Sequence, residues 1–583
     1  MIKKLLKSLR EYKKETIITP LLMVLEVAME VAIPYILTLF GEAIEKANSN
    51  GMILYGSLMV GASIISLIAG MLGGKYCAKA STGFAKNLRH DMFANVQKFS
   101  FSNIDKFSSS SLVTRLTTDV SSVQMAFMMV IRTAIRSPLM LIFSIVMSFS
   151  KHPTLPAIFF VTAPVLTFGI ILIIKNAMPI FKRVFKRYDN LNESIQENVK
   201  GMRVVKAYVR EDYETEKFST VSTSLSKDFI KAERILALNG PIMQFCLQGA
   251  LIAIALIGSR LMLNGDSSLS VWVIQSMLTY SLQILMSLQM LSMIFVMLTM
   301  SGESARRIVE VLDEKTDLTS PENAIKTVSS GDISFENVSF RYSSHAQRNV
   351  LDGINLSISS GETVGIIGAT GSSKSTLVNL ISRLYDVTEG ELKVGGINVK
   401  EYDLEVLRDN VSVVLQKNVL FSGTVRENMK WGDKNATDEE IIKALKIAQA
   451  YDFIMSSSDG LDKEVEQGGA NFSGGQKQRL CIARALVKKP KILILDDSTS
   501  AVDMKTDALL RKAFKEELPS VTKIIIAQRI ASVQDSDKIV VLDGGKINAV
   551  GTHSELIKNN EIYKEVYYSQ NKVENNDGEV ASL

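Results

Sequence analysis

A glycine- and serine-rich stretch in the second half of the chain has the composition of a phosphate-binding loop. It follows an apolar run at residues 363–367 that is typical of a buried strand, and it precedes a helical pattern at residues 377–381. The loop consists of Gly368, Ala369, Thr370, Gly371, Ser372, Ser373, Lys374, Ser375 and Thr376. Backbone N–H groups of such a turn and the dipole of the following helix both attract an anion. The spacing directs Lys374 to the β- and γ-phosphates of a nucleotide and the Ser375 hydroxyl to Mg²⁺, although the strict pattern has glycine in place of Ser373.

An aspartate ends a second apolar run. Residues 492–495 alternate isoleucine and leucine, which predicts a buried strand with the carboxylate of Asp496 at its tip. There the carboxylate can hold Mg²⁺, directly or through water. Asp497 follows at the position from which a general base orients the attacking water. Together with the phosphate loop, this strand end predicts a site for nucleotide phosphates and Mg²⁺.

A second glycine-rich helix start lies further along the chain. Ser473, Gly474, Gly475 and Gln476 follow Phe472 and precede a helical pattern at residues 477–487. Glycines before a helix expose N–H groups to another phosphate. Two phosphate sites on one chain are redundant, so one of them makes sense if it faces a second molecule.

These motifs require an α/β domain to position them. After Gly331, short β-rich runs alternate with helical patterns, which is typical of such a domain. We place the nucleotide-binding domain at residues 326–570. Residues 571–583 form a polar tail without a core-forming pattern, and we expect no packed structure there.

The first half of the chain has a different character. The 583 residues exceed what one hydrophobic core supports, and apolar runs of about 20 residues recur before position 300. Six of them have the length of membrane spans: 16–40, 52–78, 128–150, 154–176, 241–263 and 270–298. We therefore expect a six-helix membrane domain over residues 1–325. The net charge of +5 is too small to indicate a nucleic acid partner, and the three cysteines have no metal-site or disulfide pattern.

The charge distribution predicts how these spans are oriented. Basic residues are numerous in segments 79–127 and 177–240 and scarce in the other connections. Because basic residues stay on the cytoplasmic side, both termini are expected in the cytosol of a cell, which we take to be bacterial, with the protein in the plasma membrane. The helical spacing of apolar residues in both segments predicts that the spans continue into the cytosol as long helices.

Two polar or polarisable features lie within the spans. Glu26 and Glu30 share one face of the first span, where buried carboxylates are often functional. Either they contact the substrate, or they pair with Arg132 or Arg136 or face a water-filled cavity without touching it. The last span and its extension carry a helical stripe of methionines, which suits a surface that accepts many shapes but also suits ordinary helix packing or lipid contact. This methionine stripe consists of Met286, Met290, Met293, Met297 and Met300.

The order of these segments resembles that of the ATP-binding cassette (ABC) exporters, over residues 15–570. The resemblance rests on the phosphate loop, the loop carrying Gln416, the signature at residues 473–476, the strand ended by Asp496, and residues 500–503 (Ser-Ala-Val-Asp). It implies a half-transporter: an α-helical membrane domain of six helices with long cytosolic extensions, then an α/β nucleotide-binding domain of ABC type. It also implies a head-to-tail dimer that holds ATP between one chain's phosphate loop and the other chain's signature.

The resemblance assigns further roles. Tyr342 stands at the adenine-stacking position, and Gln416 would sense Mg²⁺ and the γ-phosphate. Residues 101–110 and 208–216 resemble the segments that press on the nucleotide-binding domains.

Four positions depart from the family pattern. Asp497 stands where the family has glutamate, Gln528 where it has the switch histidine, Ser373 where it has glycine, and residues 466–468 also differ. A glutamine cannot carry charge or move a proton as histidine does, and a misplacement of about 1 Å can cost roughly a hundredfold in rate. We therefore expect this chain's own site to bind ATP and hydrolyse it slowly. Its intact signature would complete the site of a partner, as in the degenerate-site subunit of heterodimeric multidrug ABC exporters.

The sequence does not identify the transported substrate. The leading hypothesis is ATP-driven export of amphipathic or hydrophobic small molecules by a heterodimer with a second half-transporter. A flippase for lipids or lipid-linked substrates is one alternative, and an ATP-gated regulatory or channel-like assembly is another. One fold serves all three, so the fold does not decide between them.

Overall fold

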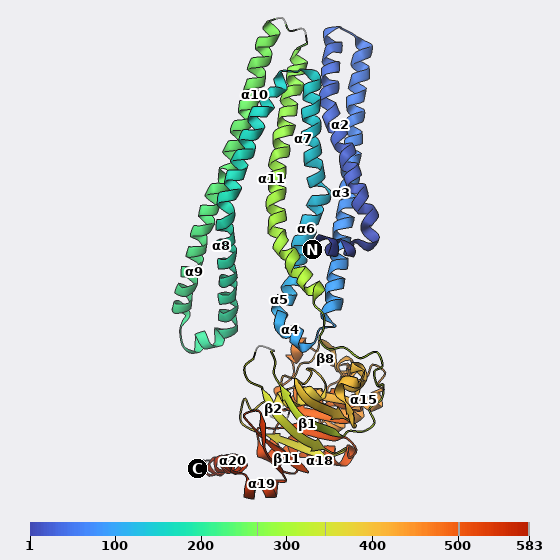
Figure 1. Cartoon of the computed structure of the whole chain (residues 1–583), viewed down its shortest axis with the longest axis vertical. Helices are drawn as coiled ribbons and strands as arrows, with labels where there is room; N and C mark the ends of the chain where they lie inside the picture. The colour runs from blue at the N-terminus through green and yellow to red at the C-terminus, as the bar shows by residue number, and fades with distance from the viewer. Residues whose placement is uncertain (265, 267, 344–345, 499–501, 581–583) are drawn as a thin grey trace. The chain divides into compact units, whose positions relative to one another are not determined.

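The chain divides into two compact units (Figure 1). The computed structural model describes residues 1–264, 266, 268–343, 346–498 and 502–580. The first unit comprises Met1–Lys98 and Ser108–Glu314, and the second comprises Phe99–Phe107 and Lys315–Leu583. The short helix α4 (Phe101–Phe107) therefore belongs to the second unit, although its sequence neighbours belong to the first.

The first unit is helical. Its helices are α1 (Ile2–Leu5), α2 (Lys13–Glu45), α3 (Ser49–Val96), α5 (Ser109–Thr114), α6 (Val120–Ile131), α7 (Thr133–Lys151), α8 (Phe159–Ala207), α9 (Glu211–Ala237), α10 (Asn239–Leu263) and α11 (Val271–Asp313). Among the described residues, six helical stretches are long and apolar enough to cross a membrane: Ile2–Glu45, Ser49–Val96, Ser109–Lys151, Leu155–Phe181, Glu211–Leu263 and Val271–Asp313. Each overlaps one predicted span, so the six-helix membrane domain is confirmed.

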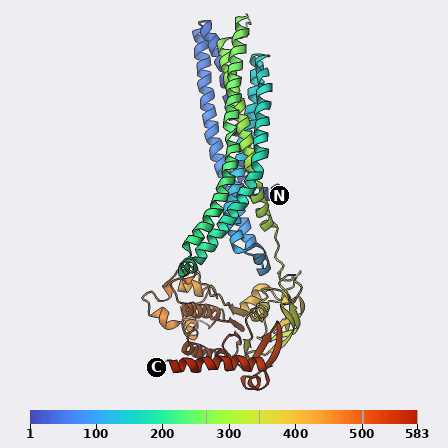
Figure 2. The ribbon, with the colours of Figure 1, turned by 90° about the vertical axis from the view of Figure 1, so that its left-hand side faces the viewer.

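Several of these helices are much longer than a bilayer requires. Helix α3 has 48 residues and α8 has 49. At 1.5 Å per residue each extends about 70 Å, whereas the hydrocarbon core of a bilayer is about 30 Å thick. Helices α8 and α9 pack along each other, as both views show (Figure 2). The predicted long extensions are therefore present. Residues 208–216 comprise the turn between these two helices, at residues 208–210, and the first residues of α9.

The two carboxylates of the first span are both paired with one arginine. Arg136 of α7 donates through Nη2 to the two carboxylate oxygens of Glu30 at 2.8 and 2.7 Å, and its Nε lies 3.3 Å from Glu26 Oε1. Charged groups at membrane depth are expensive unless they pair. The structure thus shows the paired arrangement, with Arg136 as the partner.

The second unit is built on three β-sheets. Its strands are β1 (Ile333–Phe340), β2 (Leu351–Ile358), β3 (Thr363–Ile367), β4 (Glu389–Val394), β5 (Ile397–Asn398), β6 (Val411–Val414), β7 (Gly423–Thr424), β8 (Glu464–Val465), β9 (Ile492–Asp496), β10 (Thr522–Ile526), β11 (Lys538–Asp543) and β12 (Lys546–Gly551). The largest sheet has the order β12-β11-β3-β10-β9-β6, and only β12 pairs antiparallel. The order β2-β1-β4-β5 forms an antiparallel sheet, and β7 pairs with β8.

The large sheet positions the site. Every residue of β9 and β10 is buried, as expected for parallel strands covered on both faces. Strands β3, β10 and β9 are neighbours, so their carboxyl ends meet at one edge, where ligands of such sheets bind. This confirms the predicted α/β architecture.

Helices complete the second unit. Besides α4 they are α12 (Lys374–Ile381), α13 (Leu404–Asn410), α14 (Val425–Met429), α15 (Asp438–Ile447), α16 (Tyr451–Met455), α17 (Gly474–Val487), α18 (Met504–Glu517), α19 (His553–Asn559) and α20 (Glu561–Val580). Helix α20 continues through most of the tail at residues 571–583, for which the sequence predicted no packed structure. The backbone of that tail is therefore helical as far as Val580.

Candidate nucleotide-binding site

The phosphate loop connects β3 to α12, as its sequence predicts. A Cβ atom at Gly368 would lie 2.2 Å from the carbonyl oxygen of Leu542, so only glycine fits there. Gly371 has open space around it but a φ of +87°, which glycine adopts at little cost. Thr370 lies exposed beside Gly371, and Ser372 is buried. The loop is therefore a close-fitting backbone cradle of the kind that suits phosphate.

Lys374 holds this loop together. Its Nζ donates to the carbonyl oxygens of Gly368 and Ala369 at 2.8 and 2.9 Å and to Ser372 Oγ at 3.3 Å. Burial lowers the pKa of Lys374, while the nearby carboxylates of Asp496 and Asp497 oppose this shift. The ammonium group thus already lies over the cradle, where phosphate oxygens would compete for it.

Ser373 adopts a backbone conformation that favours glycine. Its φ is +72° and its ψ is +24°, the left-handed region, and its side chain does not cap α12. A residue with a Cβ adopts this conformation at a cost of roughly 1 kcal/mol. A serine at this position therefore strains the loop backbone.

Two oxygen groups lie together at the ends of β9 and the loop. Asp496 ends β9 and is buried, and it interacts with the Ser375 hydroxyl in the first turn of α12. Burial raises the pKa of Asp496, and the hydrogen bond with Ser375 opposes that shift. A carboxylate and a hydroxyl are ligands that Mg²⁺ prefers. The donor set therefore fits the predicted metal.

An aromatic cluster adjoins the phosphate-loop helix. The Tyr342 hydroxyl lies 2.8 Å from Thr376 Oγ1, and the Tyr342 ring meets Phe340 and Tyr385 edge-on at centroid distances of 4.9 and 5.1 Å. The Tyr342 side chain is about half exposed. The predicted stacking residue is thus placed at the phosphate loop with surface left for a planar ring.

Tyr385 connects this cluster to α4. Its hydroxyl donates to Asp105 Oδ2 at 3.0 Å, and its ring lies 6.0 Å from that of Phe101. The segment 101–110 was expected to press on a nucleotide-binding domain. Its helical part does pack within the second unit, one aromatic contact away from Tyr342.

The two predicted catalytic positions, Asp497 and Gln528, converge with Gln416. Gln528 Nε2 donates to Asp497 Oδ2 at 2.9 Å, and Gln416 Nε2 lies 3.4 Å from the same oxygen. Asp497 has a φ of +51°, and its N–H donates to the Ile526 carbonyl at 3.0 Å, which ties the ends of β9 and β10 together. The three side chains therefore form one cluster at the carboxyl edge of the sheet.

The chemistry available to this cluster is limited. A primary amide neither gains nor loses a proton near neutral pH, so Asp497 is the only titratable group of the three. The two amides direct N–H groups at its carboxylate. Both amides reach the same carboxylate oxygen, Oδ2, so that oxygen is already engaged.

The signature forms a well-capped helix start. Ser473 adopts extended backbone angles, its Oγ accepts from the Gln476 N–H at 3.3 Å, and its own N–H donates to Gln476 Oε1 at 3.0 Å. This capping box leaves the first-turn N–H groups of Gly474 and Gly475 for an anion. Phe472, directly before the signature, is buried and meets Phe453 edge-on. Of residues 500–503, positions 500 and 501 lie outside the described residues.

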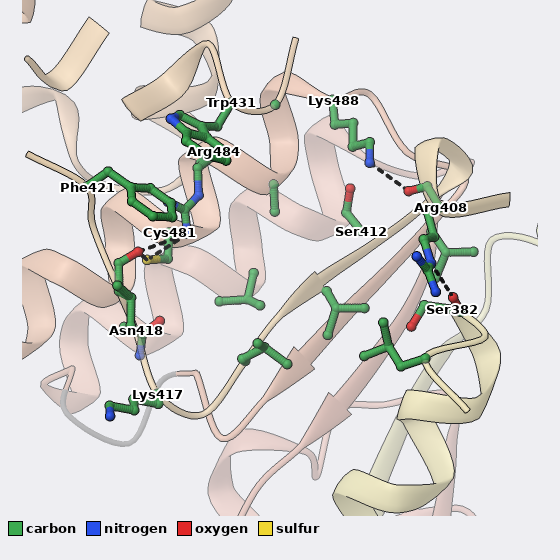
Figure 3. Close-up of a pocket in the computed structure, with 18 of the residues that line it drawn as sticks. Ser382, Arg408, Ser412, Lys417, Asn418, Phe421, Trp431, Cys481, Arg484 and Lys488 are labelled. Carbon is green, nitrogen blue, oxygen red and sulfur yellow. Dashed lines mark hydrogen bonds between the residues drawn. The ribbon is translucent and has the colours of Figure 1, made fainter. Parts of the chain in front are cut away.

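A groove of about 460 Å³ lies beside the loop that carries Gln416 (Figure 3). Trp431 and Phe421 stack in parallel at a centroid distance of 4.2 Å, and Arg484 donates to the Val419 carbonyl at 3.1 Å. Lys417, directly after Gln416, also lines the groove. The groove is therefore lined in part by the segment that carries Gln416, which contacts Asp497.

One residue that no motif marks also reaches the cluster. Gln570 of α20 contacts the backbone of Gln528 and Ile530. A lone glutamine after a tyrosine pair has no spacing or composition signal, so the sequence could not identify it.

Comparison with known proteins identifies both parts of the chain. Residues 16–288 match the ABC transporter transmembrane region, and residues 351–500 match the ABC transporter family. The chain is 36% identical over 570 residues to the uncharacterized ABC transporter ATP-binding protein YfiB of Bacillus subtilis (strain 168), with 98% of each chain covered. It is 33% identical over 572 residues to the similarly described MT1311 of Mycobacterium tuberculosis, covering 96% of this chain and 97% of that protein.

The fold is also similar to a solved structure, a bacterial Atm1-family ABC exporter with ATP bound. The TM-score is 0.81 at 23% identity, over 96% of this chain and 99% of the other. With a transmembrane region and a nucleotide-binding unit on one polypeptide, the chain belongs to the ABC transporter family and has the architecture of an exporter half-transporter.

Proposed function

We propose that this chain is the slow-hydrolysing subunit of a heterodimeric ABC exporter. The observation that carries the proposal is the cluster in which Gln528 and Gln416 both direct their amides at Asp497. A rapid site needs a carboxylate that orients water and a group that steadies the γ-phosphate with positive charge. Here the carboxylate is one methylene shorter than glutamate and is occupied by two amides, and the switch residue is neutral.

The remaining residues of the site support retention of ATP. The phosphate-loop backbone and Lys374 would bind the phosphate groups, Tyr342 would stack on adenine, and Thr376 would hold the Tyr342 hydroxyl. Mg²⁺ would be held by Ser375 and Asp496, with Gln416 near it, and supplies neutralisation of phosphate charge when bound. In this proposal, the groups that would bind ATP are retained, whereas the groups that would hydrolyse it differ from the family pattern.

The signature supports a role toward a partner. Its capping box is complete and its glycine N–H groups are free to face an anion. In a head-to-tail dimer, residues 473–476 would complete the ATP site of a second half-transporter that carries the usual glutamate and histidine. In this arrangement, the weak site keeps the nucleotide-binding units together while the other site turns over.

The ATPase of the purified chain tests this proposal. We expect little hydrolysis from the chain alone and much more after co-expression with a half-transporter that has the family's glutamate and histidine. The double variant Asp497→Glu/Gln528→His should raise hydrolysis by the chain alone by roughly tenfold to a hundredfold. Gln534→His, an exposed glutamine six residues further along, is the matched control and should change nothing. Brisk ATPase from the unaltered chain alone would refute the proposal.

For the cargo, we propose amphipathic or hydrophobic small molecules, exported across a bacterial plasma membrane with both termini in the cytosol. Most of the methionine stripe on α11 is exposed in the single chain, with Met286 at 61%. Flexible thioether side chains adapt to varied shapes. Amphipathic dyes should stimulate the ATPase of the assembled dimer and accumulate in inverted vesicles. Stimulation by lipids but not by dyes would favour a flippase, and the absence of accumulation against a gradient would favour a gated assembly.

A further inference from the structure

The C-terminal helix holds the segment that carries the switch residue. This switch segment, residues 528–530, leaves the buried end of β10 and enters a short 3₁₀ turn at Ile530–Ser532. Gln570 Nε2 donates to the Gln528 carbonyl at 2.8 Å, and Gln570 Oε1 accepts from the Ile530 N–H at 2.9 Å. One side-chain amide thus satisfies a donor and an acceptor of the segment at once.

Helix α20 is firmly fixed at its base. Tyr563 is fully buried, its hydroxyl lies 2.7 Å from His553 Nδ1, and its N–H donates to Asn560 Oδ1 at 2.8 Å. Val566 and Tyr567 pack against the same hydrophobic core that contains Ile530. Positions 563, 566, 567 and 570 follow the i, i+3, i+4, i+7 spacing of one helix face. The face that anchors α20 therefore also presents Gln570 to the switch segment.

We propose that Gln570 is a positioning residue of the ATP site, which fixes the switch segment so that the Gln528 amide meets Asp497. The contact pathway is continuous: α20 through Gln570 to the backbone of residues 528 and 530, then through the Gln528 side chain to Asp497 Oδ2 at 2.9 Å. Gln570 itself contacts backbone only and acts through Gln528. The inference rests on the proposed role of Gln528 at this site.

The size of the effect follows from two hydrogen bonds. Each neutral hydrogen bond changes an opening equilibrium by about fivefold, so their loss raises the open population of the switch segment by up to roughly 25-fold. Ile530 stays anchored by its buried side chain, so the segment opens locally while the core persists. Nucleotide affinity should fall less than this, because the phosphate loop retains its own contacts.

The test uses the full chain in lipid nanodiscs, alone and with the partner half-transporter. Gln570→Ala removes both hydrogen bonds. Gln570→Glu keeps the acceptor for Ile530 but sets a carboxylate oxygen against the Gln528 carbonyl. Ser569→Ala, an exposed neighbour, is the matched control. Hydrogen–deuterium exchange of a peptide spanning residues 527–533, affinity for a fluorescent ATP analogue with Mg²⁺, and kcat and KM in the Asp497→Glu/Gln528→His background are measured.

We expect Gln570→Ala to speed exchange of this peptide about 10- to 25-fold and to weaken binding of the analogue about threefold to tenfold. Gln570→Glu should protect the Ile530 amide yet weaken binding to a similar degree, and Ser569→Ala should do neither. In the restored background, kcat should fall several-fold with a smaller change in KM.

Two results would overturn the inference: unchanged exchange in Gln570→Ala, or faster exchange with binding and kcat untouched. Failure of the slow-site proposal would give a different experimental result. The Asp497→Glu/Gln528→His chain would then not hydrolyse ATP faster, whereas Gln570→Ala would still alter both exchange and binding.

Discussion

The two glycine-rich helix starts of the second unit are built in opposite ways. At the start of α12, Ser373 adopts a left-handed backbone and its side chain provides no cap. At the start of α17, Ser473 adopts an ordinary extended backbone and takes part in a complete capping box. Next to the first start lie the buried carboxylate of Asp496 and the left-handed Asp497. Serine thus occupies a strained backbone position at the start of α12 and forms a hydrogen-bonded cap at the start of α17.

The two helix starts therefore suit different roles: the start of α12 suits binding of this chain's own nucleotide, and the start of α17 suits completion of a partner's ATP site. The α12 start combines a strained backbone at Ser373 with the buried carboxylate of Asp496, whose negative charge a bound Mg²⁺ would offset. The α17 start satisfies its own backbone without any ligand. A preformed signature is what a partner's ATP site requires, since the signature can then bind without first ordering. The predictions below change one of the two starts at a time.

Gly368→Ala should have the largest effect. Its new Cβ would lie 2.2 Å from the Leu542 carbonyl oxygen, and a strand backbone cannot yield that much, so the cradle must deform. A displacement of about 1 Å at a phosphate site can cost roughly a hundredfold, and we expect a loss of ATP-analogue affinity of that size. Equilibrium binding of a fluorescent ATP analogue by the full chain measures it.

Gly371→Ala is the control for this experiment. No atom lies within 4 Å of its Cβ position, so only the left-handed backbone is strained, at a cost of about 1 kcal/mol. Its affinity loss should stay near fivefold to tenfold. Equal losses in the two variants would show that backbone conformation, and not the close fit against β11, limits the cradle.

Asp496→Asn should separate binding from stability. Removing a metal ligand should weaken Mg²⁺-dependent nucleotide binding roughly tenfold to a hundredfold. The nucleotide-free chain should nevertheless gain thermal stability, because burial raises the pKa of Asp496 and penalises its charged form. The penalty is absent at pH values below the pKa of this aspartate in the unfolded chain. It grows as the pH rises from that value through the raised pKa of the folded state, so the free energy of unfolding falls over this pH range.

The measurement is thermal unfolding without nucleotide at several pH values in and above the aspartate range. The variant should lose the part of the pH dependence that Asp496 causes, and its advantage should grow with pH. A variant that is less stable than the parent at neutral pH would show that the Ser375 interaction outweighs desolvation.

Local patterns explain how much of this site the sequence could predict. The strand before Gly368, the helix after Ser373 and the strand ended by Asp496 are each readable within about ten residues, and all three are present. The meeting of Gln416 and Gln528 at Asp497 joins positions 81 and 31 residues away, and only the family resemblance anticipated their shared site.

Other contacts have no local signal at all. The sequence left open whether Arg132 or Arg136 would pair with the carboxylates of the first span, because both lie on the same predicted span and only packing selects Arg136. The helical backbone at the end of α20 is a further feature that the polar sequence does not signal. A polar sequence lacks core-forming residues, but extending a helix already nucleated by the packed turns around Tyr563 costs little per residue.

Ser473→Ala should destabilise the signature helix by about 1 kcal/mol, because the Gln476 N–H loses its acceptor at the helix start. Ser473→Gly leaves the backbone at the helix start accessible to water, and it should cost only about a few tenths of a kcal/mol. Hydrogen–deuterium exchange of a peptide covering the first turn of α17 reports both. If the alanine variant exchanged no faster than the parent, the capping box would not be what orders this helix start.

Ser373→Gly should have the smallest effect and the opposite sign. Glycine relieves a left-handed strain of roughly 1 kcal/mol, but its freer unfolded chain returns much of that gain, so a net stabilisation of a few tenths of a kcal/mol remains. The same serine-to-glycine change is therefore expected to slow exchange at the first turn of α12 and to speed it at the first turn of α17. Because the substitution is identical, any general effect of glycine cancels in this pair. Changes of the same sign at both helices would show that the left-handed backbone of Ser373 is not strained. The contrast between a strained helix start and a fully capped one would then fail.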